Sequence, residues 1–160
     1  MSKRLNPHRG KQATQSNLKS KSRMTHYQKL LRISTTGKFL YNITPKVAAI
    51  VAESRVRTGL CTLFLRHTSA SLIIQENADP DVLLDLAEFM TRLVPESTNY
   101  IHNAEGPDDM PAHIRTAITH TSEHIPINNG HLVLGTWQGI YIWEHRQRNN
   151  SRELVVHISG

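Results

Sequence analysis

The 160-residue sequence has a single cysteine, Cys61, and no long hydrophobic run. One cysteine cannot form an intramolecular disulfide, and it excludes a zinc site built from cysteines alone. No apolar stretch approaches the ~20 residues that a membrane-spanning helix requires, so we expect no membrane partner. Cys61 lies in the apolar run 60–65, which predicts a buried thiol in a reducing compartment, the cytoplasm.

Acidic residues are absent from the first 46 positions, which hold eleven of the 19 Lys and Arg residues; the first acid is Glu53. The remainder carries eight basic and thirteen acidic side chains, a formal charge of −5. The net charge of +6 therefore belongs to the N-terminal part. A mildly acidic body is poorly suited to the phosphates of nucleic acid, so we expect no nucleic-acid binding by the body.

Residues 1–24 are polar and basic, with too few apolar side chains to offset the entropy cost of ordering. This predicts a disordered tail, followed by a single domain over residues 25–160. Three roles for the tail stay open: a solvated extension, a mitochondrial transit peptide, or an electrostatic arm for nucleic acid or membrane. No apolar segment follows the charges, which argues against a secretory signal.

Apolar runs and turn residues predict a domain rich in strands. Strands are expected at about 27–35, 38–43, 60–65, 71–75 and 122–127, within 132–143, and at the C-terminus. The Asn129-Gly130 step predicts a hairpin because both residues tolerate positive φ. Antiparallel hairpins with few helices indicate the α+β class, a compact mixed or antiparallel β-sandwich or barrel-like body.

Two to three helices are expected within this domain. The first has Thr44 as its N-cap and Pro45 at its first position, and Gly59 ends it. The clearest begins at Asp79-Pro80, carries an apolar stripe at helical spacing and ends at Pro95. A short third helix is expected from Pro111 to about His120.

Histidine is abundant, with ten in the chain, and no P-loop, nucleophile elbow or Rossmann glycine pattern accompanies it. His102, Asp108, Asp109 and His113 lie within fourteen positions around a Gly-Pro turn. Two imidazoles with carboxylates suit zinc or manganese, whereas carboxylates alone suit magnesium. The alternative is a solvated acidic loop with ordinary hydrogen-bonded histidines.

Polar residues at predicted strand ends are further candidates. His67, Thr68 and Ser69 follow a strand and either offer donors to an oxyanion or form a turn. Glu76 ends the next strand as a ligand, a general acid–base or a loop cap. Arg146, after Glu144, is either a phosphate fork or a surface arginine. Polar and aromatic side chains also lie between two glycines, at Thr136, Trp137 and Gln138.

Six segments together resemble one family, the YjbQ-type family, over about residues 27–160. The segments are His67-Thr68-Ser69-Ala70-Ser71, Glu76-Asn77, Tyr100-x-His102, the stretch from Glu105 to His113, Gly135-Thr136-Trp137-Gln138-Gly139-Ile140 and Glu144-His145-Arg146. The family has been linked to a secondary thiamine-phosphate synthase activity. The resemblance implies a homotrimer and a divalent metal (Mg, Zn or Mn) near His67, His102 and His113.

The implied reaction joins a pyrimidine methyl diphosphate to a thiazole phosphate and releases diphosphate, so the partner is a small phosphorylated substrate. Charge on the departing diphosphate must be neutralised. The resemblance implies that Thr68, Ser69, Thr136 and Arg146 donate hydrogen bonds to the phosphate groups. Gln138 is also expected at the substrate. Trp137 either stacks on the pyrimidine or fills core. Carboxylates for the ion or for catalysis are Glu76, Asp108, Asp109 and Glu144.

Two other functions remain open from the sequence. The same histidines would serve a metal-dependent hydrolase of phosphoesters or esters, in which water is the acceptor. A trimer that binds a small ligand without turnover is the third hypothesis.

Overall fold

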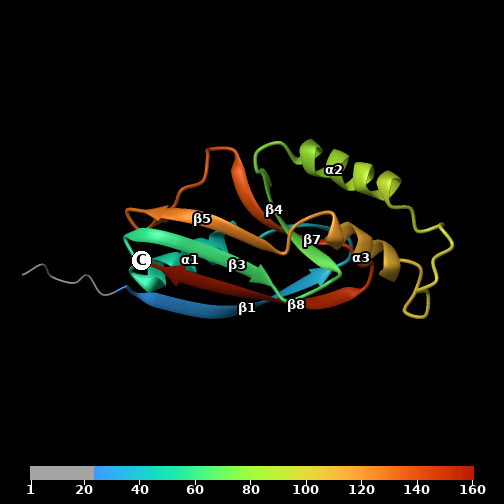
Figure 1. The fold of residues 1–160 in the computed structure, drawn as a ribbon. Coiled ribbons are helices and arrows are strands. Elements are labelled where there is room, and N and C mark those ends of the chain that lie inside the picture. Colours follow the sequence, from blue (N-terminus) through green and yellow to red (C-terminus); the bar gives the residue numbers. More distant parts are fainter. Residues whose placement is uncertain (1–23) are drawn as a thin grey trace, which may run out of the picture.

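The computed structural model describes residues 24–160, so the tail predicted over residues 1–24 lies outside the described residues except for Met24. The described chain has the predicted α+β fold, with mostly antiparallel sheets, one of them curled into a half-barrel (Figure 1). In chain order the elements are β1 (His26–Thr36), β2 (Phe39–Asn42), α1 (Thr44–Ser54), β3 (Thr58–Leu65), β4 (Ala70–Glu76), α2 (Pro80–Leu93), α3 (Asp109–Ala117), β5 (Ser122–Asn128), β6 (His131–Leu132), β7 (Gln138–Glu144) and β8 (Asn149–Ser159).

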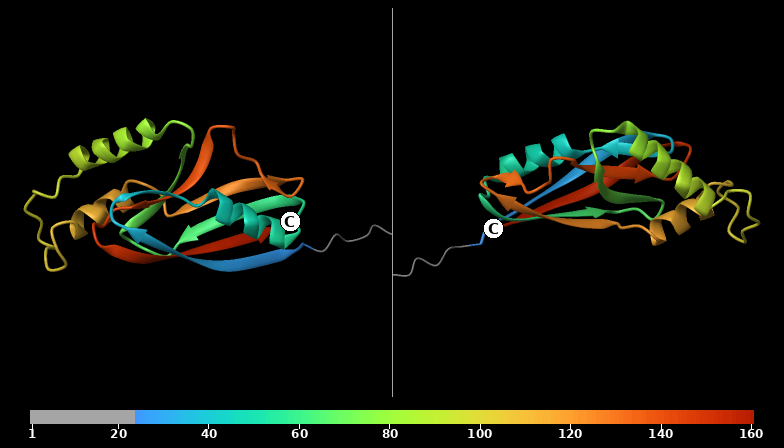
Figure 2. Two further views of the ribbon diagram at one scale, coloured as in Figure 1. Left: turned by 180° about the vertical axis from the view of Figure 1, so that it is seen from behind. Right: turned by 90° about the horizontal axis from the view of Figure 1, so that it is seen from above.

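The strands form two sheets. The larger has the order β1-β8-β3-β5-β6 and the smaller has the order β2-β7-β4, with antiparallel neighbours throughout. A turn at Gly37, where φ is +111°, separates β1 from β2, and the two strands belong to different sheets. The chain therefore leaves one sheet for the other at this turn. Figure 2 shows α1 near one end of the body and α2 and α3 near the other.

The smaller sheet lies between two apolar layers. Ile140 and Ile142 of β7 belong to the large core cluster shared with the five-stranded sheet and α1, whereas Tyr141 and Trp143 pack with Met90 of α2. Alternate residues of a strand point to opposite faces, so β7 is buried on both sides. This explains why its sequence reads as a continuous apolar run.

Helix α1 differs from the prediction at both ends. Ile43, not Thr44, is the N-cap, and the helix ends at Ser54 with Arg55 as its C-cap in the left-handed conformation (φ 59°). The Thr44 hydroxyl instead accepts a hydrogen bond from the Ile140 amide at 2.8 Å, so it ties the helix to β7. Gly59, predicted to stop the helix, lies within β3.

Helix α2 begins and ends close to the prediction, with Asp79 as N-cap accepting from the Asp81 amide at 2.9 Å. Its apolar stripe is less buried than the spacing suggests: Met90 is buried, while Phe89 and Leu93 are each 53% exposed. The helix packs on β2 and β4 of the three-stranded sheet, and its apolar stripe is only partly covered there. Within residues 24–160, no helix combines the length and apolar character that crossing a bilayer requires.

Two further local predictions had different outcomes. The Asn-Gly hairpin is confirmed: Asn129 and Gly130 have φ of 51° and 80°, and Asn128 pairs with His131. The third helix begins at Asp109 rather than Pro111 and ends at Ala117. This earlier start places Asp109 in the first helical turn, on the side of the preceding loop.

The Cys61 thiol is fully buried in β3, and burial raises its pKa from 9.0 to about 12. Only the thiolate reacts with alkylating agents, so burial lowers the reactive fraction of the thiol and also shields the sulfur from the reagent. We expect iodoacetamide at pH 8 to label the urea-unfolded chain and leave the native chain unmodified, as read by mass spectrometry. Comparable labelling of the two forms would contradict this burial.

Candidate functional site

Three side chains from one segment converge at the N-terminus of α3. His102 lies in the loop before the helix, and Asp109 and His113 lie four residues apart, on one helix face. One ligand atom of each lies within 4.8 Å of the others. His102 Nε2 is 2.7 Å and His113 Nε2 is 3.5 Å from the same carboxylate oxygen, Asp109 Oδ2. We call this group the His102–Asp109–His113 cluster.

The His113 ring is oriented by a backbone carbonyl in the loop that precedes β4. Its Nδ1 lies 2.9 Å from the carbonyl oxygen of Thr68, which can only accept, so Nδ1 carries the proton. In the neutral ring, Nε2 then presents a lone pair toward Asp109. A lone pair facing a carboxylate at 3.5 Å is satisfied by a positive charge between them, a proton or a metal ion. Imidazole held through its other nitrogen by a carbonyl is also the usual support of a metal-ligating histidine.

Asp109 is held in place by Arg146. The buried guanidinium forms an ion pair with Asp109 Oδ1 and leaves Oδ2 to the two histidines. Its Nε donates to Asp108 at 3.1 Å and its Nη2 donates to the Glu105 carbonyl at 2.8 Å. Arg146, predicted at a substrate phosphate, thus orients the acidic loop in this structure.

Asp108 belongs to this scaffold rather than to the cluster. Burial would raise the pKa of its carboxyl, but the Gln147 amide at 2.8 Å and the Arg146 guanidinium outweigh burial and lower it. The ionised form is therefore favoured. Asp108 ties the loop before α3 to the chain after β7.

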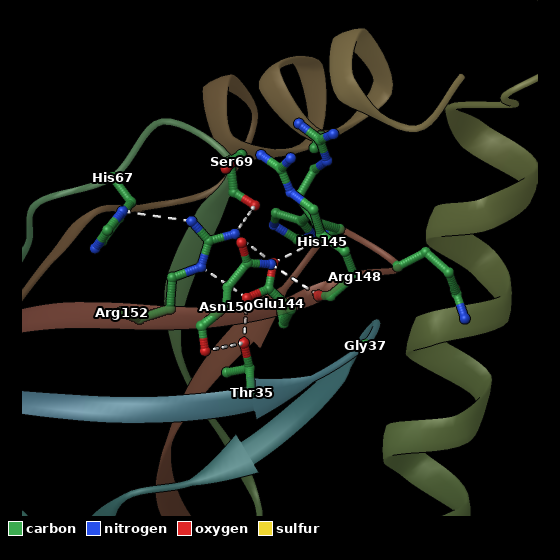
Figure 3. Close-up of polar contacts among 12 residues, drawn as sticks. Thr35, Gly37, His67, Ser69, Glu144, His145, Arg148, Asn150 and Arg152 are labelled. Carbon is green, nitrogen blue, oxygen red and sulfur yellow. Dashed lines mark hydrogen bonds and ion pairs between the residues drawn. The ribbon is translucent and has the colours of Figure 1, made fainter. Parts of the chain in front are cut away.

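Glu144 is completely buried at the centre of a second polar network (Figure 3). It accepts hydrogen bonds from Thr35 Oγ1 at 2.6 Å, from Arg152 Nε and Nη2 at 2.7 and 2.5 Å, and from the Arg146 amide at 2.9 Å. Every carboxylate lone pair thus has a donor. This network links β1, β7 and β8 beneath the site.

The structure does not bring His67 into the His102–Asp109–His113 cluster. Its Nε2 accepts from the Glu153 amide at 2.7 Å, and its Nδ1 lies 3.4 Å from Arg152 Nη1 (Figure 3). Strand β3 ends at Leu65, so no β3 carbonyl accepts from the Glu153 amide of β8. The His67 ring supplies that acceptor instead. Burial and the Arg152 charge lower the pKa of His67, which favours the neutral ring.

A surface hollow of about 460 Å³ adjoins the cluster. Thr68, whose carbonyl holds His113, is in its wall, as is Thr116, three residues beyond His113 in α3. Arg66, His67 and Ser69 also line it. The hollow therefore combines hydroxyls, a cation and an imidazole close to the candidate metal ligands.

The remaining predicted residues lie at the far end of the smaller sheet. In the β4–β7 register Ala70 faces Glu144, whereas Glu76 faces Gln138 at the opposite end. Seven strand residues span about 20 Å, so one chain does not bring Glu76, Thr136, Trp137 or Gln138 to the cluster. These side chains order the local loop: Glu76 Oε1 accepts from the Ala78 amide, and Gln138 Oε1 accepts from the Gly135 amide, each at 2.8 Å. Trp137 is 62% exposed, which excludes its predicted core-filling role within the chain.

Two buried arginines, Arg115 and Arg152, were not among the residues predicted from the sequence. Arg152 occupies the inward parity of β8 shared by Leu154 and Val156, and a charge at such a position signals a buried partner. Arg115 is buried on α3 beside Ala112. Strand parity offered a signal for Arg152, whereas the burial of Arg115 depends on how α2 and α3 pack.

Solved structures share this α+β architecture. A YbjQ-like protein of unknown function from Sulfolobus solfataricus P2 superposes with a TM-score of 0.80 at 27% identity, over 86% of this chain and 99% of that one. A YjbQ/UPF0047-family protein of Clostridium acetobutylicum superposes with a TM-score of 0.72 at 37% identity, over 82% and 98%.

The family model described as UPF0047 protein YjbQ-like matches residues 29–160. A UPF0047 protein of Synechocystis is 61% identical over 144 residues, covering 89% of this chain and 98% of its own. YjbQ of Escherichia coli O157:H7 is 42% identical over 135 residues, covering 84% and 98%. The chain therefore belongs to the YjbQ-like UPF0047 family, as its motifs indicated.

Proposed function

We propose that this protein is a divalent-metal-dependent enzyme acting on a small phosphorylated substrate. The observation that carries the proposal is the His102–Asp109–His113 cluster, in which a histidine lone pair faces a carboxylate oxygen. The donor set of two imidazoles and one carboxylate fits zinc or manganese better than magnesium. His67, expected among the ligands by resemblance, is not part of this proposal for the metal.

The reaction we propose joins a pyrimidine methyl diphosphate to a thiazole phosphate and releases diphosphate, as a secondary activity. A divalent cation, when bound, supplies positive charge to the phosphate oxygens of the departing group. Thr68 keeps the proton of His113 on Nδ1, and Arg146 keeps one oxygen of Asp109 turned toward the histidines. The hydroxyls of Thr68 and Ser69 and the Arg66 guanidinium offer donors to phosphate in the adjoining hollow.

The donor set also favours a second candidate, a phosphoester hydrolase. Two histidines with one acidic residue form the ligand set of many zinc hydrolases. The two reactions differ in the acceptor, which is the thiazole in the transferase and water in the hydrolase. Thiamine phosphate formation and a panel of phosphoesters, assayed with Zn²⁺, Mn²⁺ and Mg²⁺, separate them. If the protein neither forms thiamine phosphate nor hydrolyses any phosphoester, the result would support the third hypothesis, a ligand-binding protein.

His113→Ala tests the metal site directly. We expect the variant to lose the Zn²⁺ or Mn²⁺ that the unchanged chain binds in equilibrium dialysis, and turnover to fall by more than about a hundredfold. His131→Ala is the matched control, because His131 is an exposed histidine whose Nδ1 also contacts a carbonyl, that of Asn129 at 3.0 Å. Equal metal content in the unchanged chain and both variants would refute the site. Retained metal binding without turnover of any substrate would refute the enzyme and leave the metal site standing.

A further inference from the structure

A second cavity, of about 200 Å³, lies between α2, the turn before β2 and the end of β7. Its wall includes the polar residues Lys38, Arg115 and His145 and the apolar residues Phe39, Met90 and Trp143. No member of the His102–Asp109–His113 cluster lines it. The cavity is thus separate from the site proposed above and combines cationic with apolar walls.

Arg115 is the unusual member of this wall. It is only 3% exposed, and its Nη2 donates to the Val94 carbonyl at 2.8 Å and lies 3.6 Å from Glu96 Oε1. Within residues 24–160, its Nε is buried and has no hydrogen-bond partner. A buried guanidinium N–H without an acceptor is costly, and its persistence calls for an explanation. An acceptor brought by a ligand supplies one.

The balance of charge around the cavity is positive. Lys38 and Arg115 share a single carboxylate, Glu96. Glu144 also touches the cavity, but its oxygens are fully engaged by Thr35, Arg152 and the Arg146 amide. At the rim, Glu88 is paired with Arg92 at 2.6 Å. Two cations therefore face one carboxylate that is available to them, which leaves room for one more negative charge.

We propose that this cavity binds a small organic oxyanion, a carboxylate or a phosphate monoester. On binding, the Arg115 guanidinium shifts so that its Nε, which no water reaches in the unliganded chain, donates to the anionic head. The head also lies near the Lys38 ammonium, and a short apolar portion contacts Met90 and Trp143. The volume equals that of about six or seven water molecules, which limits the ligand to a few heavy atoms. Occupation satisfies the buried Nε and adds the missing negative charge.

Calorimetric titration of the full chain tests this proposal, with butyrate, methyl phosphate and inorganic phosphate as probes. A chelator in the buffer keeps metal from binding phosphate. We expect saturable one-site binding of butyrate or methyl phosphate, and the stronger of the two identifies the head group. Inorganic phosphate is expected to bind more weakly than methyl phosphate, because it lacks the apolar portion. No saturation by either organic probe up to about 10 mM would overturn the proposal.

Three variants locate the binding. Arg115→Lys keeps the charge but removes Nε, and weakens binding at least about tenfold. Glu96→Gln removes the internal competitor and tightens binding several-fold. Ala87→Leu fills the cavity from α2 and abolishes binding. Arg92→Lys on the exposed face of α2 is the matched control and leaves affinity unchanged. If Arg115→Lys fails to fold, the other two variants test the site, because Glu96→Gln is expected to tighten binding and Ala87→Leu to abolish it. Unchanged affinity in both variants would refute the site.

Discussion

Glu144→Gln is expected to lower the free energy of unfolding by about 3–5 kcal/mol. Glu144 is fully buried, and Arg152, which donates to it through Nε and Nη2, is 4% exposed. Removing the negative charge leaves a buried guanidinium without its counterion, in a place that water does not reach. The measurement is urea denaturation followed by circular dichroism at neutral pH.

Glu153→Gln is the matched control for this loss. Glu153 also pairs with arginines, Arg66 at 2.9 Å and Arg32 at 3.2 Å, but on the outer face of β8 where water competes. Exposed pairs contribute less than about 1 kcal/mol, so this variant is expected to unfold close to the parent. Equal losses in the two variants would contradict the role given to the buried Glu144–Arg152 pair. Adding Arg152→Met to Glu144→Gln is expected to restore part of the stability, because it removes the stranded charge.

Acidification is expected to destabilise the fold through His145. Burial, together with the charges of Arg115, Arg152 and Lys38, lowers its pKa from 6.5 to about 3. Below pH 6.5 the unfolded chain therefore binds a proton that the folded chain excludes. The contribution of His145 to the free energy of unfolding is fully present above pH 6.5 and is lost as the pH falls toward 3. The expected slope approaches about 1.4 kcal/mol per pH unit, or about 2 kcal/mol by pH 5.

His145→Gln isolates this contribution, since the amide can still bond the Ser71 hydroxyl, now 2.9 Å from Nε2, and does not titrate. The difference in unfolding free energy between parent and variant is expected to shrink by about 2 kcal/mol from pH 7 to pH 5. The control is His124→Gln, because the His124 imidazole also contacts a hydroxyl, that of Thr62 at 3.1 Å, but is exposed. A pH-independent difference for His145→Gln would rule out a buried neutral imidazole.

Local signals in the sequence predicted most of the secondary structure. The Asp79-Pro80 start of α2, the Asn129-Gly130 hairpin and the alternation of β8 each depend on residues a few positions apart. The cluster's segment was local as well, because His102, Asp109 and His113 lie within twelve positions around one turn. Short-range sterics and periodicity are contained in the sequence itself.

Long-range placement was the part that sequence reasoning missed. His67 was grouped with His102 and His113, but strand pairing turns its ring to the Glu153 amide. The Arg146 guanidinium holds Asp108 and Asp109 in the folded chain, and its contact with a substrate phosphate stays a prediction. Each outcome depends on which distant backbone group lies within hydrogen-bond reach, which no local pattern states.

By itself, the sequence determined the α+β class, the family, the buried thiol and the loop that carries the candidate metal ligands. Only the tertiary structure decided which charges are buried and what neutralises them: Glu144 meets Arg152 and Thr35 because β7, β8 and β1 converge at one end of the body. The physical reason is register. Antiparallel pairing of β4 with β7 places Glu76 and Glu144 at opposite ends of the same sheet, so two acids that look equivalent in the sequence occupy different environments.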